Sequence, residues 1–150
     1  MGNGTTTSCY YATIHKNSSV ILAQCVQNLG QRAFIGKVNM NKNLDPEYVE
    51  TSDDSYNDTV SFIEEVWALK NDLIKPIITP RFALSCDMNL MKELAQLAGK
   101  YNIPIQTHVS ENKAEVEAVA NEYPNCKNYV DVYDVAGLIT EKVYYGYFRI

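Results

Sequence analysis

The chain has 150 residues, of which 46% are hydrophobic, and 13 Lys and Arg stand against 18 Asp and Glu for a net charge of −5. This length is about that of one average domain, and the apolar content is enough to build a sizeable core. The negative charge and the absence of a Lys/Arg run argue against nucleic acid as a partner, because binding to phosphates depends on clustered basic residues.

The sequence also argues against membrane insertion and secretion. No apolar run approaches the roughly 20 residues of a membrane span, and MGNGTTTSCYYATIH lacks a basic region leading into an apolar one. The four cysteines are widely separated and include no Cys-x-x-Cys pair, so neither a zinc ribbon nor a disulfide scaffold is indicated. We therefore expect a cytoplasmic protein with reduced thiols.

The first half of the chain predicts two strand–helix units. A strand over residues 5–11 precedes a helix over 18–29, which Gly30 would cap. The buried face of this helix is predicted to hold Leu22, Cys25, Val26 and Leu29. A second strand over 32–38 precedes a helix that begins near Thr51. The buried stripe of that helix is predicted to hold Tyr56, Val60, Ile63 and Trp67.

The second half predicts two further units. A strand over 75–80 leads to a helix over 87–100 that begins with a capping aspartate. The core face of this helix is predicted to hold Leu90, Leu94, Leu97 and Ala98. A strand over 103–108 follows, and Asn112 with Glu115 forms a variant of the capping box at the next helix. That helix is predicted to bury Val116, Val119, Ala120 and Tyr123.

The end of the chain predicts one more short helix, over 130–138, and an aromatic stretch over 143–150 that reads as a final apolar strand. Strands that alternate with amphipathic helices predict a parallel sheet, because each parallel connection needs a crossover. Both a doubly wound sheet and a βα barrel meet this condition. A doubly wound nucleotide-binding sheet would have a glycine-rich phosphate loop after a strand, and no strand here is followed by one. The sequence therefore favours the other α/β fold, a partial (β/α)₈ TIM barrel of about four βα units.

Polar residues follow each predicted strand, at the end where parallel α/β folds bind their ligands. In chain order they are His15, Asn39, Arg81 and His108. We expect a structural role for His15. His108 differs because the carboxylate of Glu111 follows on the same loop, and an imidazole can hold a metal while a nearby carboxylate moves protons. Taken alone, Arg81 would be a surface residue and its neighbour Phe82 a core residue.

Five segments of the chain carry a family resemblance. They are NGTTTSCYYATIH, GQRAFIGKV, KPIITPRFALSC, IPIQTHVSEN and EVEAVANEYPNCKNYVDVYD. Over about residues 3–142 they resemble the guanine deaminase family of the amidohydrolase superfamily, and TPRF together with HVSEN at this spacing is typical of that family. The resemblance implies hydrolysis of guanine to xanthine and ammonia in purine catabolism, on a (β/α)₈ barrel that holds one catalytic zinc, in a homodimer.

The same resemblance implies roles for four residues. His108 resembles a zinc ligand at a strand end, and Glu111 resembles the carboxylate that transfers protons. Arg81 and Phe82 resemble the pair that contacts the purine. These residue types suit the chemistry, because zinc lowers the pKa of bound water to about 7, a carboxylate can accept and deliver a proton, and an arginine offers fixed donors beside an aromatic face.

The sequence departs from the family pattern at both ends. The family places a His-x-His pair upstream of the first segment and further metal-binding His and Asp residues downstream, and neither has a counterpart here. A catalytic zinc typically has three protein ligands, and His108 alone stands in a suitable place. We therefore expect a fragment, with a partial amidohydrolase barrel over 1–142 and a non-homologous aromatic tail over 143–150. The isolated chain is expected to be inactive. The alternative is a non-catalytic truncated form that binds a partner such as the full-length enzyme.

Overall fold

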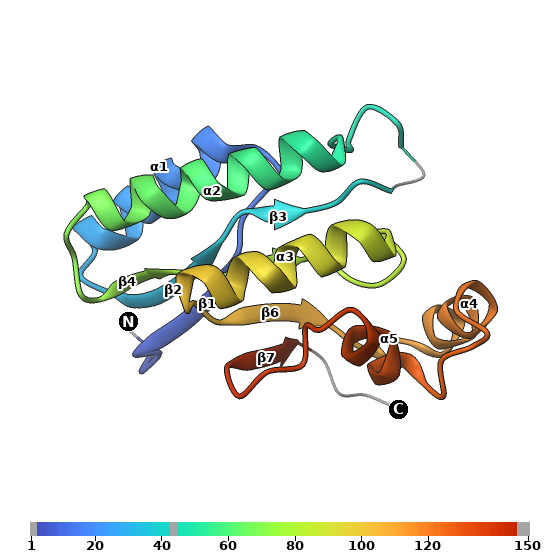
Figure 1. The fold of residues 1–150 in the computed structure, drawn as a ribbon. Helices are drawn as coiled ribbons and strands as arrows, with labels where there is room; N and C mark the ends of the chain where they lie inside the picture. The colour runs from blue at the N-terminus through green and yellow to red at the C-terminus, as the bar shows by residue number, and fades with distance from the viewer. Residues whose placement is uncertain (1–2, 43–44, 147–150) are drawn as a thin grey trace.

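The structure is a computed structural model that describes residues 3–42 and 45–146. Strands and helices alternate along most of the chain (Figure 1). In order they are β1 (Thr7–Tyr11), α1 (Lys16–Asn28), β2 (Arg32–Gly36), β3 (Val38–Asn39), α2 (Ser52–Ala68), β4 (Ile74–Pro76), β5 (Thr79–Pro80), α3 (Met88–Tyr101), β6 (Ile105–His108), α4 (Lys113–Glu122), α5 (Tyr129–Val135) and β7 (Val143–Gly146).

The order of the strands in space follows their order in the chain. β1 pairs with β2, β2 with β4, β3 with β5, and β6 with β7, all in parallel. A bridge between Ile78 and Ile105 connects the β4–β5 segment to β6. A doubly wound sheet reverses its strand order partway across, whereas a (β/α)₈ barrel keeps it. The predicted α/β fold is therefore confirmed as a portion of a (β/α)₈ barrel.

The helices occupy two places relative to the strands (Figure 1). α1, α2 and α3 run alongside the strands, and the buried apolar residues of all three join one core cluster with those of β2, β4 and β6. α4 and α5 lie at the end toward which the arrows of β3, β6 and β7 point. The carboxyl ends of the strands therefore face the two short helices, and this is the end where ligands bind in such folds.

The predicted caps at Gly30, Asp87 and Asn112 and the core face of α3 are confirmed, although the Glu115 carboxylate binds Tyr129 instead of completing a capping box. Thr51, Asp87 and Asn112 each accept a hydrogen bond from a backbone N–H three residues later. Gly30 follows α1 with φ +67°, a backbone conformation that glycine adopts at little cost. The buried side of α3 holds Leu90, Met91, Leu94, Leu97 and Ala98, which includes the four predicted residues.

The predicted buried faces of the other helices are partly wrong. In α1, Cys25 is exposed and Leu29 is 67% exposed beyond the last helical residue, because the core face is formed instead by Ser19, Val20, Ala23 and Val26. In α2, Trp67 is 43% exposed. The buried face of α2 holds Phe62, Ile63 and Val66. Ser55 and Thr59 also face inward, because both accept hydrogen bonds from Asn39. A pattern of hydrophobic residues cannot predict that a polar side chain is buried.

α4 is more exposed than its sequence predicts. Val119 is buried as expected and Tyr123 is half-buried, but Val116 and Ala120 are exposed. The helix buries the Glu115 side chain instead. The short helix predicted over 130–138 is observed as α5, and β7 extends the array beside β6. Residues 147–150 of the predicted tail lie outside the described residues.

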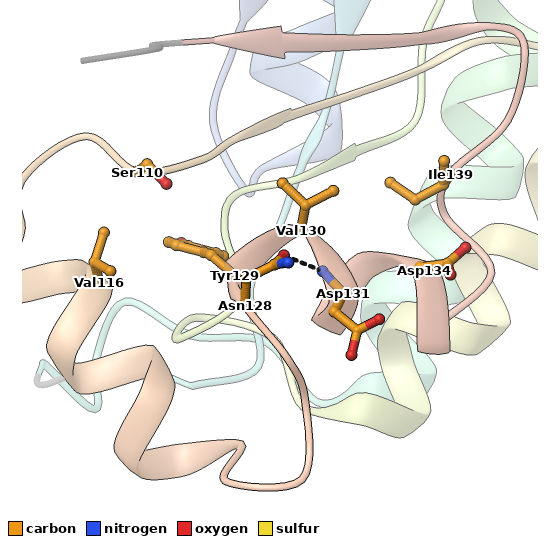
Figure 2. A pocket seen from close by; sticks show the side chains of 8 residues that line it. All are labelled: Ser110, Val116, Asn128, Tyr129, Val130, Asp131, Asp134 and Ile139. Carbon is orange, nitrogen blue, oxygen red and sulfur yellow. Dashed lines mark hydrogen bonds between the residues drawn. The ribbon is translucent and has the colours of Figure 1, made fainter. Parts of the chain in front are cut away.

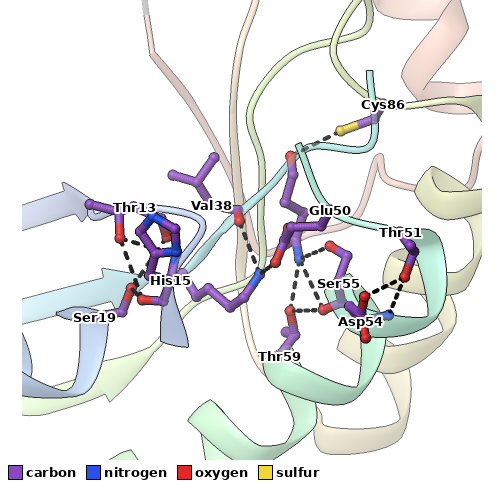
Figure 3. A network of polar contacts seen from close by, with 12 residues as sticks. Thr13, His15, Ser19, Val38, Glu50, Thr51, Asp54, Ser55, Thr59 and Cys86 are labelled. Atoms are coloured by element: carbon purple, nitrogen blue, oxygen red, sulfur yellow. Dashed lines mark hydrogen bonds and ion pairs between the residues drawn. The ribbon is translucent and has the colours of Figure 1, made fainter. Parts of the chain in front are cut away.

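Lys37 separates β2 from β3, and its side chain is fully buried in the polar network that includes Val38 and Glu50, both labelled in Figure 3. Its ammonium pairs with the Glu50 carboxylate and donates to the carbonyl oxygen of Val38 at 3.2 Å. Burial lowers the pKa of Lys37 and raises the pKa of Glu50, while the ion pair opposes both shifts. The pair fastens the loop that precedes α2 to the end of the second strand.

Gly36 lies where neighbouring strands approach closely. A Cβ atom there would lie 1.7 Å from Thr79 Oγ1 and 2.9 Å from Gln106 Nε2. Gly36→Ala is therefore expected to lower the free energy of unfolding by about 1–3 kcal/mol, measured by urea denaturation. Gly99→Ala in α3 is the matched control, because its Cβ would meet nothing within 4 Å, and it is expected to raise stability by about 0.5–1 kcal/mol. Equal effects of the two substitutions would contradict the close approach at Gly36.

Within residues 3–42 and 45–146, no helix combines the length and the apolar character that crossing a bilayer requires.

Candidate active site

The four polar residues that follow the strands do not all face one site. Asn39 is fully buried, and its Nδ2 donates to Ser55 Oγ at 2.9 Å and to Thr59 Oγ1 at 2.7 Å, so it holds α2 on β3. Figure 3 labels these two hydroxyl residues of α2. His15 is exposed at the N-terminus of α1, with its ring edge-on to Tyr48. Neither residue lines the cavity at the carboxyl ends of β5 and β6.

Arg81 and His108, in contrast, line the same cavity at the carboxyl ends of β5 and β6. The cavity has a volume of about 600 Å³. Its lining comprises Arg81, Phe82, Leu84, His108, Glu111, Asn112, Ala114, Glu115 and Ala118. All four residues singled out in the sequence as candidates for metal binding, proton transfer and substrate contact therefore border one space.

The His108 ring is held in one orientation by its neighbours. Its Nδ1 lies 2.9 Å from the carbonyl oxygen of Arg81. A carbonyl only accepts hydrogen bonds, so Nδ1 carries the proton and the lone pair of the neutral ring lies on Nε2. Tyr11 packs against the ring, with centroids 4.3 Å apart. A hydrogen bond from one ring nitrogen to a backbone carbonyl is the arrangement that orients metal-binding histidines.

Arg81 and Phe82 present a cation and an aromatic ring side by side. The Arg81 guanidinium carbon lies 5.4 Å from the centroid of the Phe82 ring, and Nη1 donates to the sulfur of Met40 at 3.2 Å. Arg81 is exposed and Phe82 half-buried. A fixed fork of donors beside a flat apolar face suits a planar heterocycle that carries a carbonyl oxygen.

Glu111 stands on the short loop between β6 and α4. Ser110, just before it, has φ +53°, a conformation that residues other than glycine seldom adopt. Asn112, just after it, accepts a hydrogen bond from the backbone N–H of Glu115 at 2.9 Å and so begins α4. The loop thus turns sharply between two anchored elements, and Glu111 is exposed to solvent at the cavity.

Sequence reasoning missed three residues around this cavity. Tyr11 contacts His108, Glu115 lines the cavity as a buried carboxylate, and the hydroxyl of Tyr133 lies 2.5 Å from the carbonyl oxygen of His108. Because side chains alternate between the two faces of a strand, the sequence of the first strand could have placed Tyr11 on the face that points into the barrel. The other two belong to helices whose orientation no local pattern specifies.

A second cavity, of about 660 Å³, lies beside α4 and α5 (Figure 2). Its lining comprises Ser110, Val116, Asn128, Tyr129, Val130, Asp131, Asp134 and Ile139. Three aliphatic and four polar side chains surround Tyr129 there, and none of the four predicted site residues borders this space. Because the residues predicted to bind metal and substrate and to transfer protons all line the cavity of about 600 Å³, that cavity is the candidate site.

The side chains of this cavity offer few ligands to a metal ion. In the part of the chain that the structure describes, no group of three or more His, Cys, Asp or Glu side chains could hold a metal ion. A catalytic zinc takes three protein ligands as a rule. The described residues therefore do not complete a zinc site, although the orientation of His108 suits one ligand of such a site.

The strand order and the residues at the strand ends define the class of protein. Residues 1–144 match the amidohydrolase family, and the chain belongs to that family. It is 52% identical over 141 residues to a guanine deaminase of Pongo abelii, a match that covers 93% of this chain and 31% of that relative. The chain thus spans about a third of the length of the relative.

Solved structures agree with this assignment. A crystal structure of guanine deaminase from C. acetobutylicum, with guanine bound in its active site, superimposes with a TM-score of 0.90 at 38% identity and covers 95% of this chain and 34% of that one. An adenosine deaminase from Xanthomonas campestris with bound zinc shares the fold, with a TM-score of 0.76 at 17% identity over 95% of this chain and 30% of that one. Structural relatives of this chain thus include a zinc-bound member.

Proposed function

We propose that this chain carries the substrate-binding and proton-transfer residues of a guanine deaminase, which hydrolyses guanine to xanthine and ammonia in purine catabolism. One observation carries the proposal: a single cavity brings together Arg81, Phe82, His108 and Glu111. The similarity to guanine deaminases, one of them with guanine bound, supports this choice of substrate.

Each residue has a role that its chemistry supports. Arg81 would donate hydrogen bonds to the carbonyl oxygen of guanine, and Phe82 would pack on the face of the purine. Glu111, exposed at the cavity, would accept a proton and deliver it to a ring nitrogen and the departing amine. The neighbouring Asn112 and Glu115 anchor the loop that holds Glu111 in place.

We propose zinc as the metal, with His108 Nε2 as one ligand and the remaining ligands supplied by polypeptide outside the described residues. Because one imidazole does not hold a catalytic zinc, the 150-residue chain on its own is expected to bind guanine without turning it over. We further propose that the complete enzyme works in the cytoplasm as a homodimer. The four cysteines, all free, fit a reducing compartment.

Binding of guanine to the purified chain tests this proposal. Arg81→Met is expected to weaken guanine binding about 10- to 100-fold in equilibrium dialysis, because the charge-assisted hydrogen bonds to the carbonyl oxygen are lost. Arg32→Met is the matched control, since Arg32 begins β2 at the opposite end of the strands and is expected to leave affinity unchanged. Equal affinity of wild type and Arg81→Met would contradict the proposal. Zinc-dependent release of ammonia by the chain alone would contradict the ligand count.

A second candidate function is non-catalytic binding to a partner, such as a full-length guanine deaminase. Among the described residues, β1 pairs with β2 alone and β7 with β6 alone. Tyr144 on β7 is 46% exposed and contacts the half-buried ring of Phe34. Edge strands with exposed aromatic residues are templates for pairing with another chain. Sedimentation of the chain with a full-length guanine deaminase distinguishes the candidates: a stable complex supports this one, and separate sedimentation removes it.

A further inference from the structure

Two tyrosines of α5 reach three segments that carry candidate site residues. Tyr129 and Tyr133 stand four residues apart on one face of the helix, are both buried, and have ring centroids 5.6 Å apart. Figure 2 shows Tyr129 pointing from α5 toward the side of Ser110 and Val116. Neither tyrosine lines the cavity of Arg81 and His108. Their contacts with the site run through their hydroxyl groups.

The Tyr133 hydroxyl joins the ends of β5 and β6. It donates to the carbonyl oxygen of His108 at 2.5 Å and accepts from the backbone N–H of Ala83 at 3.1 Å and from Thr107 Oγ1 at 3.3 Å. One donated and two accepted hydrogen bonds use the full capacity of a phenol. Ala83 directly follows Phe82, so one oxygen atom sets the spacing between the proposed substrate-binding residues and the proposed metal ligand.

The Tyr129 hydroxyl holds the element that follows Glu111. It donates to Glu115 Oε1 at 2.7 Å, and the backbone N–H of Glu115 donates to Asn112 Oδ1 at 2.9 Å. The first turn of α4 is thereby tied to α5. Since the loop before this turn is short and contains the positive φ of Ser110, the position of the turn sets the position of Glu111.

We propose that Tyr133 and Tyr129 are positioning residues of the active site: Tyr133 fixes His108 relative to Arg81 and Phe82, and Tyr129 fixes Glu111. The inference rests on the proposed function of the cavity and extends it to α5. A phenylalanine at either position would keep the ring and the packing but would remove the hydrogen bonds. Backbone groups buried around Tyr133 would then lack partners, and the strand ends would shift apart.

Tyr133→Phe and Tyr129→Phe test the inference, with Tyr10→Phe as the matched control. Tyr10 donates one hydrogen bond, to Gln31 Oε1 at 2.7 Å, and makes it on another part of the fold. The readout is the nuclear magnetic resonance spectrum of the isotope-labelled chain. The chain has two histidines, so His15 serves as an internal reference for the imidazole signals of His108.

Tyr133→Phe is expected to move the His108 signals and to lower the fraction of the His108 ring that is protonated at Nδ1. The reason is that Nδ1 donates to the carbonyl oxygen of Arg81, and Tyr133 sets the distance between the segments that carry these two residues. His15 should stay in place, and guanine affinity is expected to fall about 10-fold, as for the loss of other supporting hydrogen bonds around active sites. Tyr129→Phe is expected to move the backbone amide signal of Glu111. Tyr10→Phe should do none of these.

Unchanged His108 signals in folded Tyr133→Phe would overturn the inference for Tyr133. If that variant does not fold, Tyr129→Phe decides, and an unchanged Glu111 amide signal would overturn the inference. Guanine binding distinguishes a failure of the proposed function from a failure of the positioning role of the tyrosines. A wild-type chain that fails to bind guanine contradicts the proposed function, while the His108 and Glu111 signals still report on whether the tyrosines position them.

Discussion

Glu111→Gln is expected to lower kcat for guanine by about 10²–10⁴-fold in a full-length guanine deaminase that carries residues 1–144 of this chain in place of its own matching segment. Glutamine keeps the size of the side chain but can neither accept nor deliver the proton. Because Glu111 is exposed on an anchored loop, the substitution should leave the fold and the guanine affinity nearly unchanged. The loss should therefore fall on kcat rather than on KM.

The measurement compares steady-state deamination with guanine affinity and bound metal in the same preparations. Glu117→Gln is the matched control, since Glu117 is an exposed carboxylate of α4 that does not line the cavity. It should retain the turnover of the parent enzyme. A Glu111→Gln enzyme with intact metal content and normal kcat would remove the proton-transfer role. Loss of metal in that variant would instead assign Glu111 to metal binding.

Glu50→Ala is expected to lower the free energy of unfolding by about 3–5 kcal/mol, because it leaves the fully buried ammonium of Lys37 without its counter-ion. Urea denaturation measures the effect. The double variant Lys37→Met with Glu50→Leu should recover most of the loss, since an apolar pair of similar volume avoids the desolvation of both charges. Asp72→Ala, which breaks the exposed pair of Asp72 with Lys75, is the control and should cost less than about 1 kcal/mol.

The effect of Glu50→Ala should also depend on pH. Burial already lowers the pKa of Lys37 below its ordinary 10.5, and loss of the Glu50 charge removes an interaction that raises it. Between this lowered pKa and 10.5 the folded state binds fewer protons than the unfolded state, so stability rises with pH across that window. The deficit relative to wild type should shrink as pH rises toward about 10. A deficit that is constant with pH would show that Lys37 is not the group left uncompensated.

The sequence predicts the fold well where one local pattern determines one element. The strands, the side-chain caps Asp87 and Asn112 and the apolar side of α3 follow from residues close together in the chain. The shared location of Arg81 and His108 was predicted for a similar reason, since parallel strands bring their carboxyl ends to one edge, whereas the proposed roles of Arg81 and Phe82 came from the family resemblance. His108 and Arg81 share a cavity because each directly ends or follows a strand.

What the sequence did not predict depends on contacts between distant segments. Ser55 and Thr59 of α2 face inward because Asn39, on β3, is buried and needs hydrogen-bond partners. Tyr133 contacts the site through backbone atoms of His108 and Ala83, 25 and 50 residues away. No periodicity in α5 predicts these partners, because every residue has the same backbone groups and the sequence does not indicate which of them a distant side chain will bind. The tertiary fold is needed to bring them together.

The sequential order of the strands has a consequence for how the polypeptide acquires its structure. Paired strand residues such as Thr7 with Arg32 and Ala33 with Ile74 lie 25 and 41 positions apart, so each step closes a loop of one strand–helix unit rather than of the whole chain. The β1–α1–β2 unit can form while later residues are still being synthesised, and each subsequent unit adds to an existing edge. Assembly can thus proceed from the N-terminus during translation, without waiting for partners from the far end of the chain.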